Sequence, residues 1–241
     1  MQKEEISKSK MVAIVAVFAA LNVVTDSFAS LPEFPSGVWY SWNFLMTPLT
    51  GIVLGPLLGF ASSLIGVMIG HYVYFIDAFE FLFTIGAPIG AAVSALVFKG
   101  KWKPVLIYYI ALFVAYFATP VAWQLPLWGM WDTYLAFALL VATIFLIQKG
   151  LWTLESKKLP IILAVAAFIG LEADVLFRIF LFIPCQTYNT FYGFNLEALQ
   201  GIWAGGAVIT PIKVVLSTVT TVAIGHPLVR ILRKAAFLTN H

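Results

Sequence analysis

The sequence is poor in charge: only 10% of its 241 residues are Asp, Glu, Lys or Arg, whereas 61% are hydrophobic. A soluble domain usually carries about 25% charged and about 45–50% apolar residues. A soluble fold cannot hide this much apolar surface, because every folded chain keeps a large surface. The composition excludes soluble enzymes, nucleic-acid-binding proteins and disordered scaffolds, and it predicts an all-α integral membrane protein in contact with lipid.

Residues for metal binding and catalysis are also scarce. The single cysteine, Cys185, excludes an internal disulfide framework and a Cys-rich metal or iron–sulfur site. The three histidines lack the mutual spacing of metal ligands, and no Gly-rich phosphate loop precedes a lysine. We therefore expect no catalytic residues, no cofactor and no metal, and we expect that the chain does not hydrolyse ATP itself.

Seven long apolar runs are present, and a membrane-spanning helix needs roughly 17–25 residues. The second run is too long for one helix, and Gly55-Pro56 lies inside it, where proline interrupts the helical hydrogen bonds. Length alone leaves two interpretations, one kinked helix or two helices joined by a tight turn. The runs are 11–31, 38–76, 79–98, 104–124, 134–147, 159–183 and 202–229.

The positions of the charges decide between these interpretations, because cytoplasmic loops carry an excess of Lys and Arg. Only a split of the second run, giving about eight transmembrane helices, places all four basic clusters and both termini in the cytoplasm of a multi-pass cell-membrane protein. The clusters are Lys3, Lys8 and Lys10; Lys99, Lys101 and Lys103; Lys149, Lys157 and Lys158; and Arg230, Arg233 and Lys234. The outer loops then hold no Lys or Arg, and their charged residues are all acidic: Asp26, Glu33, Asp77, Glu80, Asp132 and Glu197.

Four charges fall inside the last two apolar runs: Glu172, Asp174, Arg178 and Lys213. A charge at membrane depth costs about 2.5–3.5 kcal/mol on insertion scales, so each should face the protein interior and find a partner. Asp174 and Arg178 are four residues apart and can pair, and Glu172 and Lys213 lie at matching depths. Structural pairing and ligand binding are both open: a free Arg178 or Lys213 would bind an anionic group, and a free Glu172 a cationic one.

The outer loops are rich in aromatic and amide side chains. The interfacial aromatic belt explains most of the tryptophans, including Trp128, but residues 184–196 hold more Tyr and amide groups than a belt requires. Aromatic faces with a few convergent polar groups suit a small, flat organic ligand. The candidate substrate-binding residues are Trp39, Tyr40, Asn43, Arg178, Gln186, Tyr188, Asn189 and Lys213.

Small residues recur at four-residue spacing, which places them on one helix face and lets backbones approach closely. Internal packing explains most of these motifs, and a docking face for another membrane protein is the alternative for the first. They are Ala16-x-x-x-Ala20, Pro48-x-x-Gly51-x-x-x-Gly55-Pro56-x-x-Gly59, Gly66-x-x-x-Gly70 and Gly86-x-Pro88-x-Gly90.

In their order along the chain, these motifs resemble those of the substrate-binding S-components of energy-coupling factor (ECF) transporters. Residues 48–70 are similar to the family's second and third helices, residues 83–95 to its fourth helix, and residues 183–213 to the last outer loop and the start of the last helix, with Thr210-Pro211-Ile212-Lys213. Ala16-x-x-x-Ala20 resembles the first-helix motif that meets the transmembrane coupling subunit. The resemblance covers residues 8–98 and 159–234, and it implies a six-helix core.

The chain departs from this pattern over residues 104–150, which hold two further apolar runs. We expect them to be an inserted helical pair within a single membrane domain, 1–241. An even number of extra helices keeps the later helices in the orientation that the basic clusters require. The resemblance therefore implies neither the shape of the pocket nor the identity of the substrate.

The resemblance implies high-affinity binding and uptake of a small, vitamin-like micronutrient, with a ring favoured by the aromatic cup. The implied partners are a transmembrane coupling subunit, docked at Ala16 and Ala20, and a pair of cytoplasmic ATPases. The leading alternative is a self-sufficient secondary transporter that uses Glu172, Asp174 and Lys213 as an ion or proton relay. A membrane enzyme acting on lipids and a binding protein without a transport role are further alternatives.

Overall fold

The structure, a computed structural model, describes residues 8–27, 41–75, 77–155 and 157–234, and over these residues it contains helices and no strands. The ten α-helices of this part are α1 (Lys8–Ser27), α2 (Thr47–Leu54), α3 (Pro56–Val73), α4 (Glu80–Phe83), α5 (Gly86–Phe98), α6 (Trp102–Phe117), α7 (Trp131–Gln148), α8 (Leu159–Phe182), α9 (Thr187–Thr190) and α10 (Leu196–Lys234). Three 3-10 helices lie between them: η1 (Asn43–Leu45), η2 (Pro120–Gln124) and η3 (Leu127–Met130).

Six stretches of the described chain are helical, long and apolar enough to cross a membrane, as the composition predicts. Two apolar helical stretches, Asn43–Leu54 and Trp102–Phe117, are shorter than a usual span. Length therefore supports six crossings, and the two shorter stretches occupy the places of the second and fifth predicted spans. The six long ones are Ser9–Ser27, Pro56–Val73, Glu80–Phe98, Leu127–Gln148, Leu159–Phe182 and Leu196–Arg233.

The second apolar run is broken at Gly55, as the two-helix interpretation predicts. Gly55 has φ 84° and ψ 174°, so α2 ends at Leu54 and α3 begins at Pro56. A positive φ suits glycine, and proline is tolerated at the first position of a helix because its missing N–H has no helical partner there. Gly-Pro thus ends one helix and starts the next within two residues.

Helix α2 differs from a lipid-facing span because all eight of its residues are buried. It lies against α3 and α5, and Gly51 permits this packing: a Cβ there would collide with the backbone carbonyl of Ala91 on α5. A Cβ at Gly59 of α3 would lie 2.7 Å from the Cα of Gly51. The small-residue spacing therefore serves internal helix packing here, as we expected for most of these motifs.

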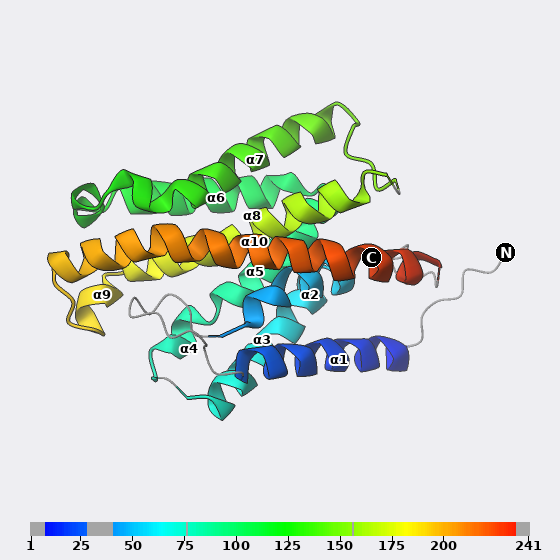
Figure 1. Cartoon of the computed structure of the whole chain (residues 1–241), viewed down its shortest axis with the longest axis horizontal. Coiled ribbons are helices and arrows are strands. Elements are labelled where there is room, and N and C mark those ends of the chain that lie inside the picture. The colour runs from blue at the N-terminus through cyan, green and yellow to red at the C-terminus, as the bar shows by residue number, and fades with distance from the viewer. Residues whose placement is uncertain (1–7, 28–40, 76, 156, 235–241) are drawn as a thin grey trace.

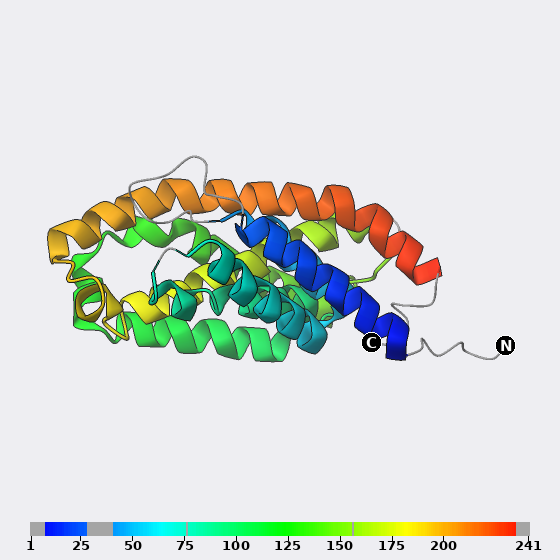
Figure 2. The same cartoon turned by 90° about the horizontal axis from the view of Figure 1, so that it is seen from below.

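Helix α8 is the central element and contacts α2, α5, α6, α7 and α10. In Figure 1, α1 and α3 form one flank of the molecule and the inserted pair α6 and α7 forms the other. Two tyrosines fasten this pair to the core: Tyr108 and Tyr109 of α6 donate hydrogen bonds to the carbonyls of Ala173 and Ile169 at 2.7 and 2.6 Å. Figure 2 shows α10 running along the length of the molecule.

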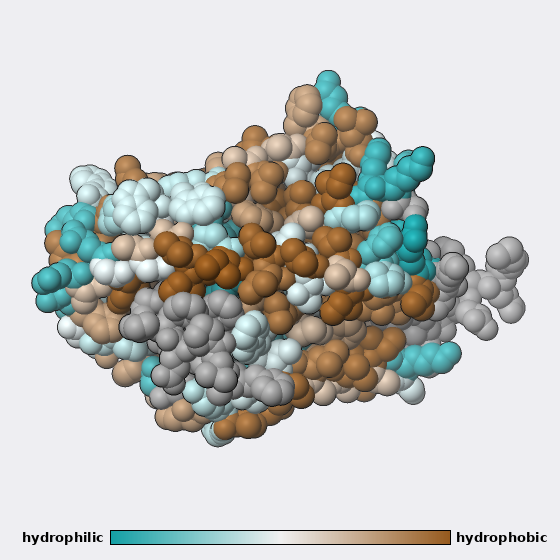
Figure 3. Space-filling view, in the orientation of Figure 1, coloured by the Kyte–Doolittle hydropathy of each residue, from teal (hydrophilic) through white to brown (hydrophobic). Residues whose placement is uncertain are grey.

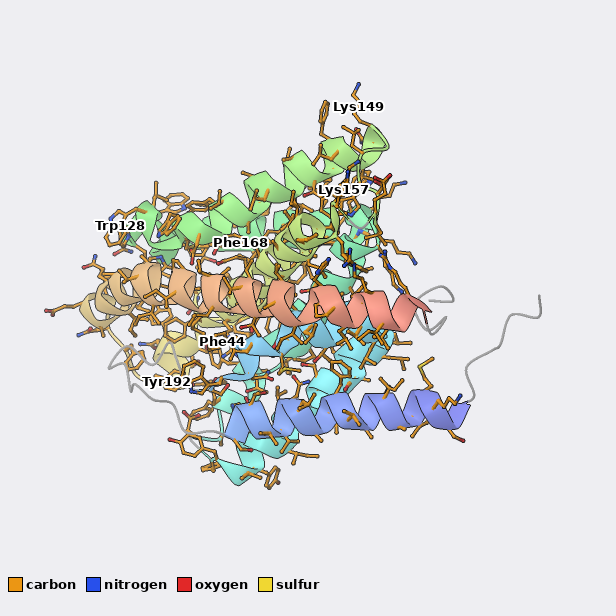
Figure 4. The ribbon with its side chains drawn as sticks, turned by 45° about the vertical axis from the view of Figure 1, so that its right-hand side comes forward. Phe44, Trp128, Lys149, Lys157, Phe168 and Tyr192 are labelled. Atoms are coloured by element: carbon orange, nitrogen blue, oxygen red, sulfur yellow. The ribbon has the colours of Figure 1, made fainter. Side chains whose placement is uncertain are left out.

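The two ends of the molecule differ in charge. The start of α1, the α7–α8 connection and the end of α10 lie at one end, the right in Figure 1, and these segments carry three of the four basic clusters. Figure 4 shows Lys149 and Lys157 there, whereas Trp128 and Tyr192 lie at the opposite end. A band of apolar surface crosses the middle of the molecule (Figure 3). We call the end without these clusters the aromatic end.

Candidate functional site

A cavity of about 790 Å³ opens near the aromatic end, between α4, the junction of η3 with α7, α8 and the first half of α10. This volume falls within the range of about 300–1,000 Å³ that is typical of small-molecule sites. Its aromatic lining residues are Phe83, Phe182, Tyr192, Phe194 and Trp203. Its polar lining residues are Glu80, Asp132, Thr133, Arg178, Thr210 and Lys213.

The aromatic rings pack into continuous walls. Tyr192 and Phe194 are stacked, with ring centroids 5.4 Å apart, and each lies 6.2 Å from the ring of Phe182. On the α10 side, Trp203 is stacked on Tyr116 of α6 at 6.0 Å, with 6° between the ring planes. These rings offer flat apolar surfaces of the kind that bind a planar ligand.

Arg178 links α8 to α4 at the edge of the cavity. Its Nε donates to Oδ1 of Asp174 at 2.8 Å, so the predicted pair four residues apart is confirmed. Its Nη1 donates to Oε1 of Glu80 at 3.0 Å. The side chains of Asp174 and Glu80 are 9% and 7% exposed, and that of Arg178 is 33% exposed. One guanidinium therefore offsets two negative charges that are shielded from water.

Two more carboxylates meet at Thr133. Oε2 of Glu172, which is fully buried on α8, accepts a hydrogen bond from the Thr133 hydroxyl at 3.0 Å. Oδ1 of Asp132, on α7, accepts one from the Thr133 backbone N–H at 2.9 Å. The remaining oxygens, Oε1 of Glu172 and Oδ2 of Asp132, are buried and receive no bond from another group, and the two carboxyl groups hydrogen-bond to each other. The observed partners of Glu172 are thus Thr133 and Asp132, where the sequence indicated Lys213.

Lys213 enters the cavity from α10, and its Nζ lies 5.6 Å from the centroid of the Phe44 ring, within cation–π distance. It also borders a cleft of about 30 Å³ together with Asn43 and Arg178. Asn43 is buried, and its side-chain amide donates to Thr47 at 3.4 Å. Two of the candidate residues, Arg178 and Lys213, therefore line the main cavity, and Asn43 lies next to them.

Three other candidates lie on the connection between α8 and α10 without lining the cavity. Gln186 and Asn189 are exposed, and Tyr188 is half-buried with its ring 6.2 Å from that of Phe182. The same connection places Tyr192 in the cavity wall. Trp39 and Tyr40 lie outside the described residues.

The proposed docking residues lie on the outward face of α1. Ala16 and Ala20 are both exposed, whereas the neighbouring Ala19 is buried. Ala19 faces α3, because a Cβ at Gly66 of α3 would lie 2.7 Å from the carbonyl oxygen of Ala19. Helix α1 thus packs on α3 through another face, and the Ala16–Ala20 stripe takes no part in that packing.

A second buried polar cluster joins α1, α3 and the segment before α5. Nδ1 of His71 lies 2.6 Å from Oδ2 of Asp26, and its Nε2 lies 2.7 Å from the Thr84 hydroxyl. The order hydroxyl, imidazole, carboxylate is that of hydrolases. However, the adjoining cleft of about 30 Å³ has room for a water molecule and not for an organic substrate. We interpret the cluster as a tether between helices.

Of the cavity residues, the candidates from the sequence include only Arg178 and Lys213; those missed include Glu80, Asp132, Thr133 and Trp203. Sequence reasoning assigned the two acids to outer loops, whereas both lie in the first turn of a helix and are buried. Their position at the start of apolar runs is the signal that could have identified them, because an acid is stabilising at a helix N-terminus.

In comparisons with protein-family models, with curated proteins and with solved structures, nothing matches this chain. The functional assignment therefore depends on the residues and geometry described above.

Proposed function

We propose that the protein is the substrate-binding component of an ATP-driven, ECF-type transporter in the cell membrane. It captures a small, vitamin-like micronutrient that contains a ring. The observation that carries this proposal is the cavity near the aromatic end, which combines flat aromatic walls with charged side chains from apolar helices. A cavity of this kind can bury most of a small ring compound and orient it through a few polar contacts.

The proposed orientation has eight membrane crossings, with the basic end and both termini in the cytoplasm. The cavity then faces outward, because its lining residues lie near the end away from the basic clusters. The short helix α2 would cross together with η1 inside a shell of other helices, which suits its complete burial. A substrate could thus be captured from outside and released only after a change in the protein's position or shape.

The proposed partners are a transmembrane coupling subunit and a pair of cytoplasmic ATPases. The exposed Ala16 and Ala20 support a docking role for α1, since small side chains allow another helix to approach closely. Val12 and Val17, which are 67% and 57% exposed, enlarge the apolar surface of the same helix. This surface can contact lipid or a second membrane protein.

Uptake by reconstituted vesicles tests the proposal. Vesicles that contain this chain, the coupling subunit and both ATPases should accumulate the ligand when ATP is supplied. Vesicles with this chain alone should bind the ligand but not accumulate it, with or without an imposed proton gradient. Gradient-driven accumulation by the chain alone would contradict the proposal.

One observation favours the alternative of a self-sufficient secondary transporter. Asp132 and Glu172 are buried carboxyl groups that hydrogen-bond to each other, and buried acids of this kind can carry protons in pumps and transporters. In that case Asp132→Asn and Glu172→Gln should abolish gradient-driven uptake by the chain alone, whereas Glu197→Gln, at an exposed position, should not.

A further inference from the structure

The inserted pair contributes an acidic wall to the cavity, formed by Asp132 and Thr133 of α7. Asp132 is 2% exposed and lines the cavity, and Glu172 lies behind it, fully buried. The two carboxyl groups hydrogen-bond to each other, and no other group donates to Oδ2 of Asp132 or Oε1 of Glu172. Two carboxylates in contact repel each other unless a proton or a cation lies between them, so this wall is a place for positive charge.

The net charge around the cavity also favours a positively charged ligand. Among the described residues that line the cavity or bond directly to its lining, four are acidic and two are basic. They carry a formal charge of −2 when all are ionised: Glu80, Asp132, Glu172 and Asp174 against Arg178 and Lys213. Arg178 already bonds to Asp174 and Glu80. Asp132 and Glu172 bond to each other, so a cation entering the cavity would replace their shared proton and offset the negative charge of the pair.

The acidic wall is built at the meeting of the inserted pair with the core. Asp132 and Thr133 lie on α7, and Glu172 lies on α8. Thr133 gives its backbone N–H to Asp132 and its hydroxyl to Glu172, and the two carboxyl groups also bond to each other. Trp203 lines the same cavity, and a Cβ at Gly129, three residues before Asp132, would collide with its ring. The cavity therefore offers an aromatic surface together with the carboxyl group of Asp132.

We infer that the ligand is a flat ring compound that carries a positively charged nitrogen group, and that this group binds to Asp132. The ring lies against the aromatic wall, and Glu172 holds the Asp132 carboxyl group in place through their mutual hydrogen bond. The inference rests on the proposed binding function and narrows its substrate class. It also gives the inserted pair a role: α7 supplies the acid that selects for a cation.

Three probes of nearly the same shape distinguish a preference for the charge of the ligand from a preference for its shape. Benzamidinium, benzamide and benzoate share a planar ring skeleton and carry positive, zero and negative charge at neutral pH. Their binding to the detergent-solubilised full chain is measured through tryptophan fluorescence and through the shift in thermal unfolding temperature. Benzamidinium should bind about tenfold or more tightly than benzamide, because hydrogen bonds to a charged group are the stronger ones. Benzoate should bind weakest.

Matched variants locate the preference. Asp132→Asn keeps the size and the acceptor oxygen for Thr133 but should remove the advantage of benzamidinium over benzamide. Glu172→Gln should reduce that advantage, and Glu197→Gln, an exposed acid on α10, should leave it unchanged. Unfolding curves without probe show that each variant is folded.

Two results would overturn the inference: benzoate binding at least as tightly as benzamidinium, or a charge preference that survives Asp132→Asn. An equal response to all three probes, or no response to any, would also count against it. These outcomes differ from failure of the transport proposal. Accumulation by the chain alone would refute the ECF-type mechanism and leave the cation preference intact.

Discussion

Arg178 and Glu80 are 98 residues apart in sequence, yet Nη1 of the arginine lies 3.0 Å from Oε1 of the glutamate. The pair holds the short helix α4 against α8. Helix α4 also contributes Phe83 to the cavity wall, so the same contact positions part of the proposed binding surface. Stability and binding should therefore both depend on it.

Replacing Arg178 by alanine should destabilise the protein by about 3 kcal/mol, because Glu80 and Asp174 would lose their shared cation while still shielded from water. The free energy of unfolding in detergent is the measurement. As a control, Lys149→Ala, at an exposed position, should change stability by less than about 0.5 kcal/mol. Equal unfolding of the Arg178 variant and the wild type would show that the ion pairs contribute nothing.

The tether at His71 should couple energetically to Asp26. A double-mutant cycle with Asp26→Asn and His71→Gln should give an interaction energy of about 1–2 kcal/mol, since the two side chains form a buried contact at 2.6 Å. Chemical unfolding of the two single variants and the double variant provides the data. Additive effects would mean that this contact adds nothing to the other contacts between α1 and α3.

Gly51 should be intolerant of any side chain. Gly51→Ala would force the new methyl group against the carbonyl of Ala91, so α2 and α5 must separate, at a cost of about 1–3 kcal/mol. Gly201→Ala is the matched control, because a Cβ there meets nothing within 4 Å and alanine favours the helix. The two variants should therefore change the unfolding temperature in opposite directions, and similar shifts would contradict the packing described for α2.

The native Cys185 offers a direct test of membrane orientation. It is exposed just beyond α8, near the aromatic end, and should react in intact cells with a maleimide that cannot cross the membrane. Partial burial raises the pKa of its thiol, so less thiolate is present at neutral pH and the labelling rate should rise over a higher pH range than for an ordinary cysteine. A Cys185→Ser, Lys101→Cys variant should label only after permeabilisation. The reverse pattern would invert the proposed topology.

The Ala16–Ala20 stripe should be needed for transport and not for binding. Trp at both positions should abolish ATP-driven uptake, because bulky side chains would keep the coupling subunit away, while ligand affinity stays within about twofold. Ile161→Trp controls for added bulk, since Ile161 is 65% exposed on a different helix, α8. Loss of binding in the double variant would mean that the stripe supports the fold instead.

Local features of the sequence predicted much of the fold. The break at Gly55-Pro56 follows from the backbone limits of two adjacent residues, and the Asp174–Arg178 pair follows from helical spacing. Glu80 with Arg178, and Asp132 and Thr133 with Glu172, could not be predicted in this way. These contacts join segments brought together only by tertiary packing. Hydropathy also cannot distinguish a short buried helix such as α2 from a full membrane span.

The central claim is that a small molecule binds in this cavity, and the most direct test is native mass spectrometry of the gently extracted protein. The wild type is compared with a variant whose cavity is filled by a larger side chain. Gly206 lines the cavity and a Cβ there meets nothing within 4 Å, so Gly206→Trp should fill the space while leaving the helix intact. Val208, which is 63% exposed on the same helix and does not line the cavity, gives the matched control Val208→Trp. We predict a bound small-molecule mass on the wild type and on Val208→Trp, and none on Gly206→Trp. The same bound mass on all three proteins would contradict the assignment of the ligand to this cavity.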